Sequence, residues 1–390
     1  MKKKYAFILF FLLLIKPLQA QVQLSEYSEI SIVTAGPGTE LYEAFGHSAI
    51  RIKDPILQLD LIYNYGMFDF KQPNFYTNFT KGNMIYSLAK YDFKYFLASY
   101  KRNKRWVKQQ VLNLNKQQKQ DYFIFLENNA LSKNKNYNYD PYFNNCATVL
   151  RDITSTILGD KVIFSDKNLP KNQSFRQLMD QETPWNTWGS FGINLVLGSK
   201  LDAKPNFKQY MYLPDYVYTI FKNSVVFIKN QPENLVKRED ILLDYKELKQ
   251  EISMVSPFLI FCIISVIGIF FTYSDYKKKK RTKWLDFILL FATGILGVVV
   301  VFLWFFTDHA TAPNNFNFLW AFAPNLVIAF LMLKQHPKKW LHAYFKFLIF
   351  MLGLMPILWI LEVQLFPIST IPFLMLLFIR YFYISKKLNS

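Results

Sequence analysis

The C-terminal third of the chain consists of long apolar segments, and these constrain its fold more than any other feature of the sequence. Crossing a bilayer takes about 20 predominantly apolar residues in a helix, and five segments approach or reach that length. They cover residues 257–273, 285–306, 318–333, 340–361 and 368–384. The sequence therefore predicts a membrane domain with five transmembrane helices in residues 252–390, preceded by a polar domain in residues 21–251.

The loops between these segments differ in charge, and the difference predicts their orientation. The sequences "DYKKKKRTK" and "KQHPKK", which follow the first and third segments, are rich in lysine. The other two loops, "TDHATAPNNFNF" and "EVQLFPIST", contain no Lys or Arg. Because basic loops stay in the cytoplasm, we expect the polar domain to lie outside and the C-terminus to lie inside.

The N-terminus has the layout of a secretory signal peptide. In "MKKKYAFILFFLLLIKPLQA", three lysines precede an apolar run and a polar stretch that ends at Ala20. This predicts a signal peptide over residues 1–20 with cleavage after Ala20. Leu18 is a less usual residue three positions before the cut, so an uncleaved anchor is the alternative. Both versions export the domain that follows.

The net charge of +18 does not indicate a nucleic-acid partner. Residues 21–251 hold 29 Lys and Arg against 24 Asp and Glu, so most of the excess lies in the N-terminal segment and the membrane part. This distribution reflects membrane topology and not a phosphate-binding face. One basic cluster, "YKRNKRWVK" at residues 100–108, is either a solvated face or a site for anionic lipid head groups.

The exported domain reads as an α+β fold. The stretches "EISIVTAGPG", "AFGHSAIRIKD", "LDLIYNYGMFDF" and "RWVKQQVLNL" have the composition and alternation of strands. Helical spacing follows in "NKQQKQDYFIFLENNAL", with Asn115 as a cap, and in "NNCATVLRDITSTIL", where a helix begins near Asn144 or Asn145. This spacing places Cys146 in the first turn of a helix.

Cys146 is one of two cysteines, and the other, Cys262, lies in an apolar segment. A helix N-terminus favours thiolate over thiol and so lowers the pKa of a cysteine there. Its free amides, with Asn145 as a candidate helper, can also hold an oxyanion. A nucleophile needs a base, and His47 is the only histidine of the exported domain. If the two residues face each other, they form the dyad of cysteine hydrolases and acyltransferases.

Simpler interpretations of these two residues stay open. A buried free cysteine usually acts as a small apolar residue, and a cysteine without an exported partner can form an intermolecular disulfide in an oxidising compartment. One histidine and one cysteine fall short of a zinc site. The sequence shows no Gly-rich phosphate motif, and we expect neither a metal nor a cofactor.

Several motifs in order carry a resemblance to a known family. They are "AFGHSAIRI", "YNYGMFDF", "YDPYFNNCATVLRDI", "PWNTWGSFGINLVLGSKLDAKPN" and "YLPDY". Together they resemble the periplasmic domain of Lnb, the lipoprotein N-acyltransferase family of Bacteroidota. The apolar tail with "FFTDHATAPNNFNFLWAFAPN" is similar to the membrane part of its longer members. More distantly, the strand histidine and the Asn-Cys helix start are similar to the permuted papain-like group, which includes lecithin:retinol acyltransferase and NlpC-type peptidases.

The resemblance implies a permuted papain-like domain in which His47 is the base and Cys146 the nucleophile. The residues that match the surrounding motif, in supporting roles, are Asn145, Asp140, Arg151 and Asp152. It also implies a multi-pass protein of the bacterial inner membrane that transfers an acyl chain from a phospholipid, through a cysteine thioester, to the N-terminal amine of diacylated lipoproteins. The alternatives are a membrane-tethered cysteine peptidase or amidase acting on the cell wall, and a non-catalytic ligand-binding membrane protein. Several spans suit the first interpretation because both of its substrates lie in the bilayer.

The loop "FFTDHATAPNNFNF" gathers polar residues at the outer membrane face without Lys or Arg. We expect it to pack under the exported domain and to help form the substrate access to Cys146, with Asp308, His309 and Asn317 as the candidate residues. The alternative is that its Asn and Asp residues only cap helices and turn the chain.

Overall fold

A seven-stranded antiparallel sheet forms the centre of the exported domain in the computed structural model, which describes residues 22–389. The predicted signal peptide, residues 1–20, lies outside the described residues. The strand order is β10-β5-β1-β2-β3-β4-β6. The strands are β1 (Glu29–Ala35), β2 (His47–Asp54), β3 (Leu59–Met67), β4 (Ile85–Asp92), β5 (Val107–Leu112), β6 (Asn136–Asn138) and β10 (Val236–Leu243), with β7 (Val162–Ile163), β8 (Val225–Ile228) and β9 (Gln231–Asn234) in a second, small sheet.

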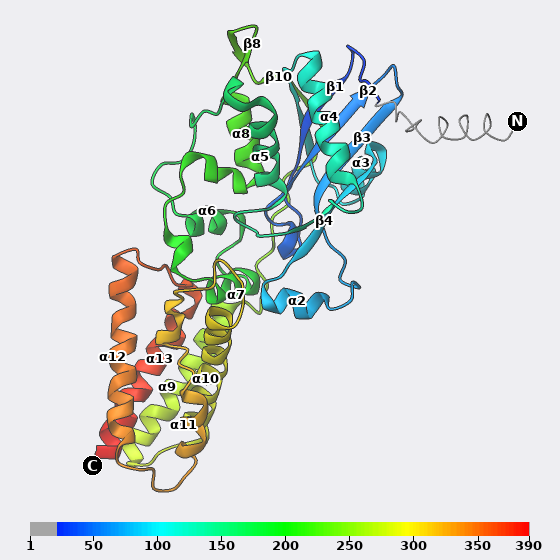
Figure 1. Ribbon diagram of the computed structural model, residues 1–390. Helices are drawn as coiled ribbons and strands as arrows, with labels where there is room; N and C mark the ends of the chain where they lie inside the picture. Colours follow the sequence, from blue (N-terminus) through cyan, green and yellow to red (C-terminus); the bar gives the residue numbers. More distant parts are fainter. Residues whose placement is uncertain (1–21, 390) are drawn as a thin grey trace, which may run out of the picture.

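Helices cover both faces of this sheet (Figure 1). The helices of the exported domain are α2 (Phe75–Lys81), α3 (Phe93–Arg102), α4 (Lys116–Ala130), α5 (Cys146–Leu158), α6 (Phe175–Glu182), α7 (Trp188–Val196) and α8 (Pro214–Asn223). The larger core packs Ile50 and Ile52 of β2 beneath α4, α5 and α8, and a smaller core packs Ala49 against α3. The predicted α+β class is therefore confirmed, and so is the alternation of β2 between its two faces.

The membrane part has four helices long and apolar enough to span a bilayer, and not the five that we predicted from the sequence. They are α9 (Pro257–Lys278), α10 (Lys283–Phe305), α12 (Leu341–Ile360) and α13 (Ile371–Asn389). The third apolar segment instead forms the 3-10 turn η5 (Phe316–Leu319) and the eight-residue helix α11 (Asn325–Met332). The prediction was wrong because it counted apolar length without the break at Pro324, where a helix loses a backbone donor.

The irregular chain before α11 and the first turn of α11 lie against α10. An added Cβ on Gly294 would meet the Leu326 nitrogen at 2.2 Å, and one on Gly297 would meet the Ala321 carbonyl oxygen at 2.3 Å. These glycines let the two backbones approach closely, and irregular backbone at membrane depth is tolerated where protein covers it. Arg281 donates to the carbonyl oxygens of Met332 and Lys334, so this segment brings the chain back to the basic end of the bundle.

The loop after α10 packs beneath the exported domain, as its position in the sequence led us to expect. The side chains of Asn315 and Asn317 both donate to the Leu195 carbonyl oxygen at the end of α7. The backbone N–H of Gly198 donates to Thr311, and Asp202 accepts from the Leu365 N–H in the second outer loop. Hydrogen bonds from both outer loops thus join the two parts of the protein.

Candidate active site

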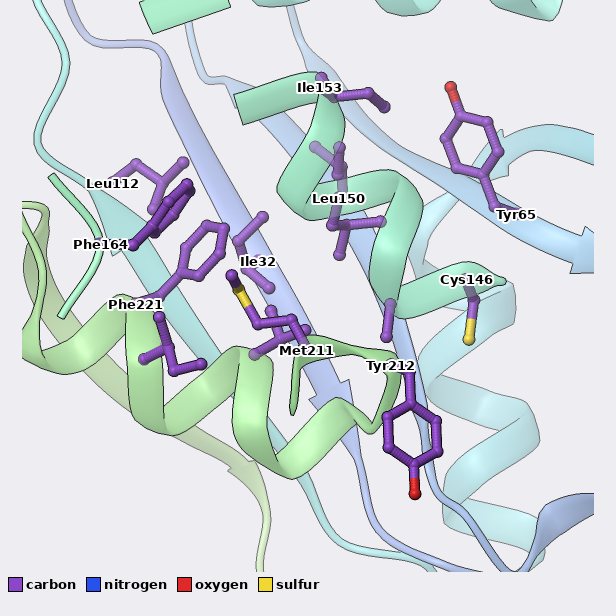
Figure 2. Close-up of a cluster of buried hydrophobic side chains, with 14 of the residues drawn as sticks. Ile32, Tyr65, Leu112, Cys146, Leu150, Ile153, Phe164, Met211, Tyr212 and Phe221 are labelled. Carbon is purple, nitrogen blue, oxygen red and sulfur yellow. The ribbon is translucent and has the colours of Figure 1, made fainter. Parts of the chain in front are cut away.

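Cys146 is the first residue of α5, and the turn before it is tightly held. Asp140 accepts hydrogen bonds through its carboxylate from the backbone N–H groups of Tyr142 and Phe143. Asn145 caps the helix, because its side-chain oxygen accepts from the backbone N–H groups of Ala147 and Thr148 at 2.9 Å. The predicted start of this helix is confirmed. Figure 2 shows the sulfur of Cys146 pointing away from Leu150 and Ile153 of the same helix.

All hydrogen-bonding atoms of the Asn145 side chain are engaged in holding the turn and capping α5. Its amide nitrogen donates to the carbonyl oxygens of Pro141 at 2.6 Å and Tyr212 at 2.8 Å, and its oxygen accepts the two capping bonds. An amide with every atom engaged has no free donor for an oxyanion. In the structure, Asn145 positions Cys146 and does not offer the donor that the sequence suggested.

The structure brings His47 beside Cys146 although the alternation of β2 directs its side chain to the face opposite α5. The pairing of β2 with β3 begins only at Ile50 and Tyr63, so the first three residues of β2 have no partner on β3. β3 is also irregular between Asn64 and Met67. The hydrogen-bond ladder between β2 and β3 is therefore interrupted next to the start of α5, and we call this interruption the opening. Gly66 borders this opening, where an added Cβ would lie 3.6 Å from the Cβ of Cys146.

The electrostatics of the pair favour its charged form. Burial raises the pKa of the Cys146 thiol, but the charge of His47, a hydrogen bond with it, and the backbone N–H groups of Ser48 and Ala147 outweigh this effect and lower the pKa. For His47, burial lowers the pKa, whereas the Cys146 sulfur and the hydrogen bond with Asn64 raise it to a net value above normal. Opposite shifts of this kind are what a thiolate beside an imidazolium requires.

The sequence analysis missed Asn64, which lies 5% exposed on β3. Its side-chain oxygen lies 2.6 Å from Nε2 of His47, and its amide nitrogen donates to the Tyr91 hydroxyl and the Met67 sulfur. Asn64 therefore holds the imidazole of His47 at Nε2. The only sequence signal was an amide residue between two tyrosines, on a strand whose other polar residue, Asp60, lies at its start.

Two tyrosines of the β6 region border the same opening. Both the Tyr139 ring and the Tyr137 hydroxyl lie within about 4 Å of the point where a Cβ on Gly66 would stand. Burial raises the pKa of both phenols, so they stay protonated. The Tyr137 hydroxyl is buried and has no hydrogen-bond partner among residues 22–389, although the backbone N–H of Gly66 lies near enough to oppose the rise of its pKa. A buried donor without a partner beside a thiol is able to bind a ligand oxygen.

Two family models match the chain. The Lnb N-terminal periplasmic domain matches residues 16–181, and the Lnb transmembrane domain matches residues 249–389. The chain belongs to the Lnb family. Membership supports a lipoprotein N-acyltransferase-like role and the division into a periplasmic domain and a membrane domain. No curated protein and no solved structure matches the chain.

The other predicted site residues lie at varying positions around this Lnb site. Arg151 bonds its neighbour Asp152 and the Lys208 carbonyl oxygen, and none of these contacts involves the cysteine or the histidine. Among residues 22–389, no group of three or more His, Cys, Asp or Glu side chains is placed to hold a metal ion.

The outer-loop residues divide into two sets. Asp308 is exposed, and His309 is close enough to Asp140, in the turn before Cys146, for that carboxylate to favour its protonated form; burial nonetheless lowers the pKa of His309 overall. Asn317 is fully buried, and its amide bonds α7 and Trp320. His309 therefore lies within electrostatic range of the turn before Cys146, while Asn317 lies in the joint with α7.

Proposed function

We propose that this Lnb protein is a lipoprotein N-acyltransferase of the bacterial inner membrane with Cys146 as nucleophile and His47 as base. Its donor is a membrane phospholipid, and its acceptor is the N-terminal amine of a diacylated lipoprotein. The observation that carries the proposal is a thiol whose pKa is lowered by an adjacent histidine, in an exported domain hydrogen-bonded to a membrane bundle. Family membership supports the class of reaction.

In the first step, the Cys146 thiolate attacks an ester carbonyl carbon of the phospholipid. The carbonyl oxygen becomes an oxyanion, and donors near the sulfur stabilise it. The candidates are the backbone N–H of Ser48, the backbone N–H of Cys146 itself and the hydroxyl of Tyr137, because the N–H groups of Ala147 and Thr148 donate to the Asn145 cap. The carbon–oxygen ester bond then breaks, the leaving oxygen takes a proton from His47, and lysophospholipid departs from the acyl thioester.

In the second step, the amine of the lipoprotein attacks the thioester carbonyl carbon. Neutral His47 accepts the proton that the amine loses, and the carbon–sulfur bond breaks to release the Cys146 thiolate. The products are an amide on the lipoprotein and the original thiolate–imidazolium pair. Asn64 holds the imidazole through Nε2 in both steps, which leaves Nδ1 to exchange protons.

The cell-wall peptidase alternative uses the same pair of residues but gives the acyl group to water. The bundle argues for transfer between lipids, because a tether needs one span and the described part of the chain has four helices of spanning length. The substrate access that we assign to Asp308 and His309 belongs to the same proposal, since this loop lies at the outer end of α10.

The test uses the full chain in phospholipid vesicles with a synthetic diacylated lipopeptide. We expect mass spectrometry to show one added acyl chain on the lipopeptide amine, and none with the Cys146→Ser variant or with a lipopeptide whose amine is acetylated. Release of free fatty acid without acylated peptide would instead establish a hydrolase. Absence of both products would contradict the proposal and leave the cell-wall peptidase and the non-catalytic alternatives.

A further inference from the structure

The segment between β3 and β4, residues 68–85, carries an exposed aromatic cluster outside the mechanism above. Phe70, Tyr76 and Phe79 are 53%, 69% and 48% exposed. Tyr76 and Phe79 lie three residues apart on α2, so they share one face of the helix. A concentration of large apolar side chains at a protein surface marks a contact with another apolar surface.

This segment is attached to the outer end of the membrane bundle. The backbone N–H of Asp308 donates to the Lys81 carbonyl oxygen at 2.8 Å, and the His309 ring lies beside the carbonyl of Phe79. Gly82 permits the contact, because its φ is +84° and an added Cβ would lie 2.6 Å from the His309 nitrogen. In Figure 1, α2 lies crosswise to the spanning helices and at the level of α7.

The outer end of α10 is itself aromatic. Phe305 and Phe306 are 64% and 70% exposed, and Asp308 lies two residues after Phe306. Aromatic side chains at the end of a spanning helix lie at the level of the lipid head groups. The exposed rings of α2 therefore continue an aromatic belt that the spanning helices already define.

We infer that residues 68–85 form an interfacial element whose Phe70, Tyr76 and Phe79 side chains insert into the outer leaflet of the bilayer that the four helices cross. A short amphipathic helix of this kind lies in the plane of the membrane with its apolar face among the acyl chains. The occupant of the patch is the phospholipid bilayer, because the patch is continuous with the membrane-facing surface of α10.

A series of ring contacts connects this element to the nucleophile. Within the segment, Phe79 stacks on Phe75, and Phe75 contacts Phe68. Phe68 contacts Tyr86 with ring centroids 5.0 Å apart, and Tyr86 stacks on Tyr139 at 4.2 Å.

Tyr139 borders Gly66, which lies beside Cys146. This part of the inference rests on the proposed function. The rings guide a phospholipid acyl chain from the leaflet to the thiol of Cys146.

The direct test measures membrane depth and does not depend on activity. A nitroxide spin label is placed at position 76 or 79 of the full chain, in which Cys146→Ser and Cys262→Ala have removed the native thiols. The matched control is position 95, since Tyr95 is 61% exposed on α3, which lies far from the bundle. In phospholipid vesicles we expect collisions with a water-soluble nickel complex to fall several-fold at 76 and 79 relative to 95, and collisions with oxygen to rise.

Labels at 76 and 79 that are as accessible to the nickel complex as the label at 95 would overturn the inference, whatever the transfer activity. A second arm uses the protein with its thiols intact. Tyr76→Ser combined with Phe79→Ser should reduce acyl transfer from bilayer phospholipid several-fold, leave alkylation of Cys146 unchanged, and differ from Tyr95→Ser. If the labelled chains show the expected depth but the wild-type chain shows no transfer at all, the proposed function fails and the membrane contact stands.

Discussion

Nε2 of His47 lies 2.6 Å from the side-chain oxygen of Asn64, so the same imidazole that acts on the pKa of Cys146 is held by an amide on β3. A neutral imidazole has one donor and one acceptor nitrogen. Because the Asn64 oxygen accepts from Nε2, the proton of a neutral His47 stays on Nε2, and in the proposed mechanism Nδ1 takes the proton of the thiol. Asn64 is thus a positioning residue that selects the tautomer.

We predict that Asn64→Ala lowers acyl transfer by up to about a hundred-fold, the loss expected when a reacting group is misplaced by roughly 1 Å. The hydrogen bond with Asn64 contributes to the raised pKa of His47. The active pair needs protonated His47. Loss of this hydrogen bond lowers the pKa of His47, so the alkaline limb of the pH–rate profile moves to lower pH. Asn64→Asp, which keeps an acceptor and adds negative charge, moves that limb to higher pH.

The matched control for this pair is Asn113→Ala, which removes a side chain that bonds Glu233 away from the site. It should leave the pH profile unchanged. If Asn64→Ala lowered the rate equally at every pH and left the apparent pKa of both limbs unchanged, Asn64 would have a purely structural role.

A second prediction concerns the reactivity of Cys146. Iodoacetamide should alkylate the wild-type protein below pH 8.5, roughly the pKa of a free cysteine. In His47→Ala the burial that raises the thiol pKa persists while the largest lowering effect is gone. The onset of alkylation should therefore move above the value of a free cysteine and not merely return to it.

This prediction is checked by measuring the alkylation rate against pH with peptide mass spectrometry. His309→Ala is the control histidine and should keep the wild-type curve. Indistinguishable curves for wild type and His47→Ala would show that His47 does not influence the thiol of Cys146.

A third prediction addresses the loop after α10. His309→Ala combined with Asn317→Ala should weaken acyl transfer to the lipopeptide without changing the alkylation curve of Cys146. His309 lies near the turn that precedes the cysteine, and Asn317 holds the loop to α7. Equal transfer rates for this variant and the wild type would show that the loop serves only as a connection.

Local chemistry made part of this fold predictable from sequence. Asn115 and Asn145 each precede a helix and accept hydrogen bonds from its first N–H groups, so the two helix starts could be located without knowledge of the tertiary structure. Likewise, the alternation along β2 assigned Ile50 and Ile52 to one face. Such features depend on neighbours within a few residues.

The features that were missed depend on distant contacts. Asn64 becomes informative only when β2 and β3 bring it beside His47, and that arrangement depends on where their pairing stops. The third apolar segment has the composition of a span, but Pro324 and the close approach to Gly294 and Gly297 produce a short helix. The amino-acid composition of a segment does not show whether another helix will cover its irregular backbone in the folded protein.

A fourth prediction concerns stability at the basic end of the bundle. Arg380 is fully buried and pairs with Asp275 at 2.8 Å and Asp286 at 2.7 Å. Arg380→Met leaves both carboxylates without this partner, and breaking a buried ion pair in this way costs about 3–5 kcal/mol. Unfolding in detergent, followed by circular dichroism, should show that loss, whereas the exposed Lys277→Met at the same end should show little change. Unaltered stability of Arg380→Met would mean that the network contributes nothing to the bundle.

The central claim is that an acyl chain passes through Cys146, and trapping the intermediate tests it most directly. The full chain is incubated in phospholipid vesicles without a lipoprotein acceptor, quenched in acid and digested for peptide mass spectrometry. We predict a fatty acyl mass on the Cys146 peptide that hydroxylamine removes, that disappears when diacylated lipopeptide is added, and that is absent from Cys146→Ala and His47→Ala but present in Cys262→Ala. The account would be contradicted if the wild-type protein acylated lipopeptide without any acyl adduct on Cys146 at any time, and the Cys146→Ser variant acylated lipopeptide equally well.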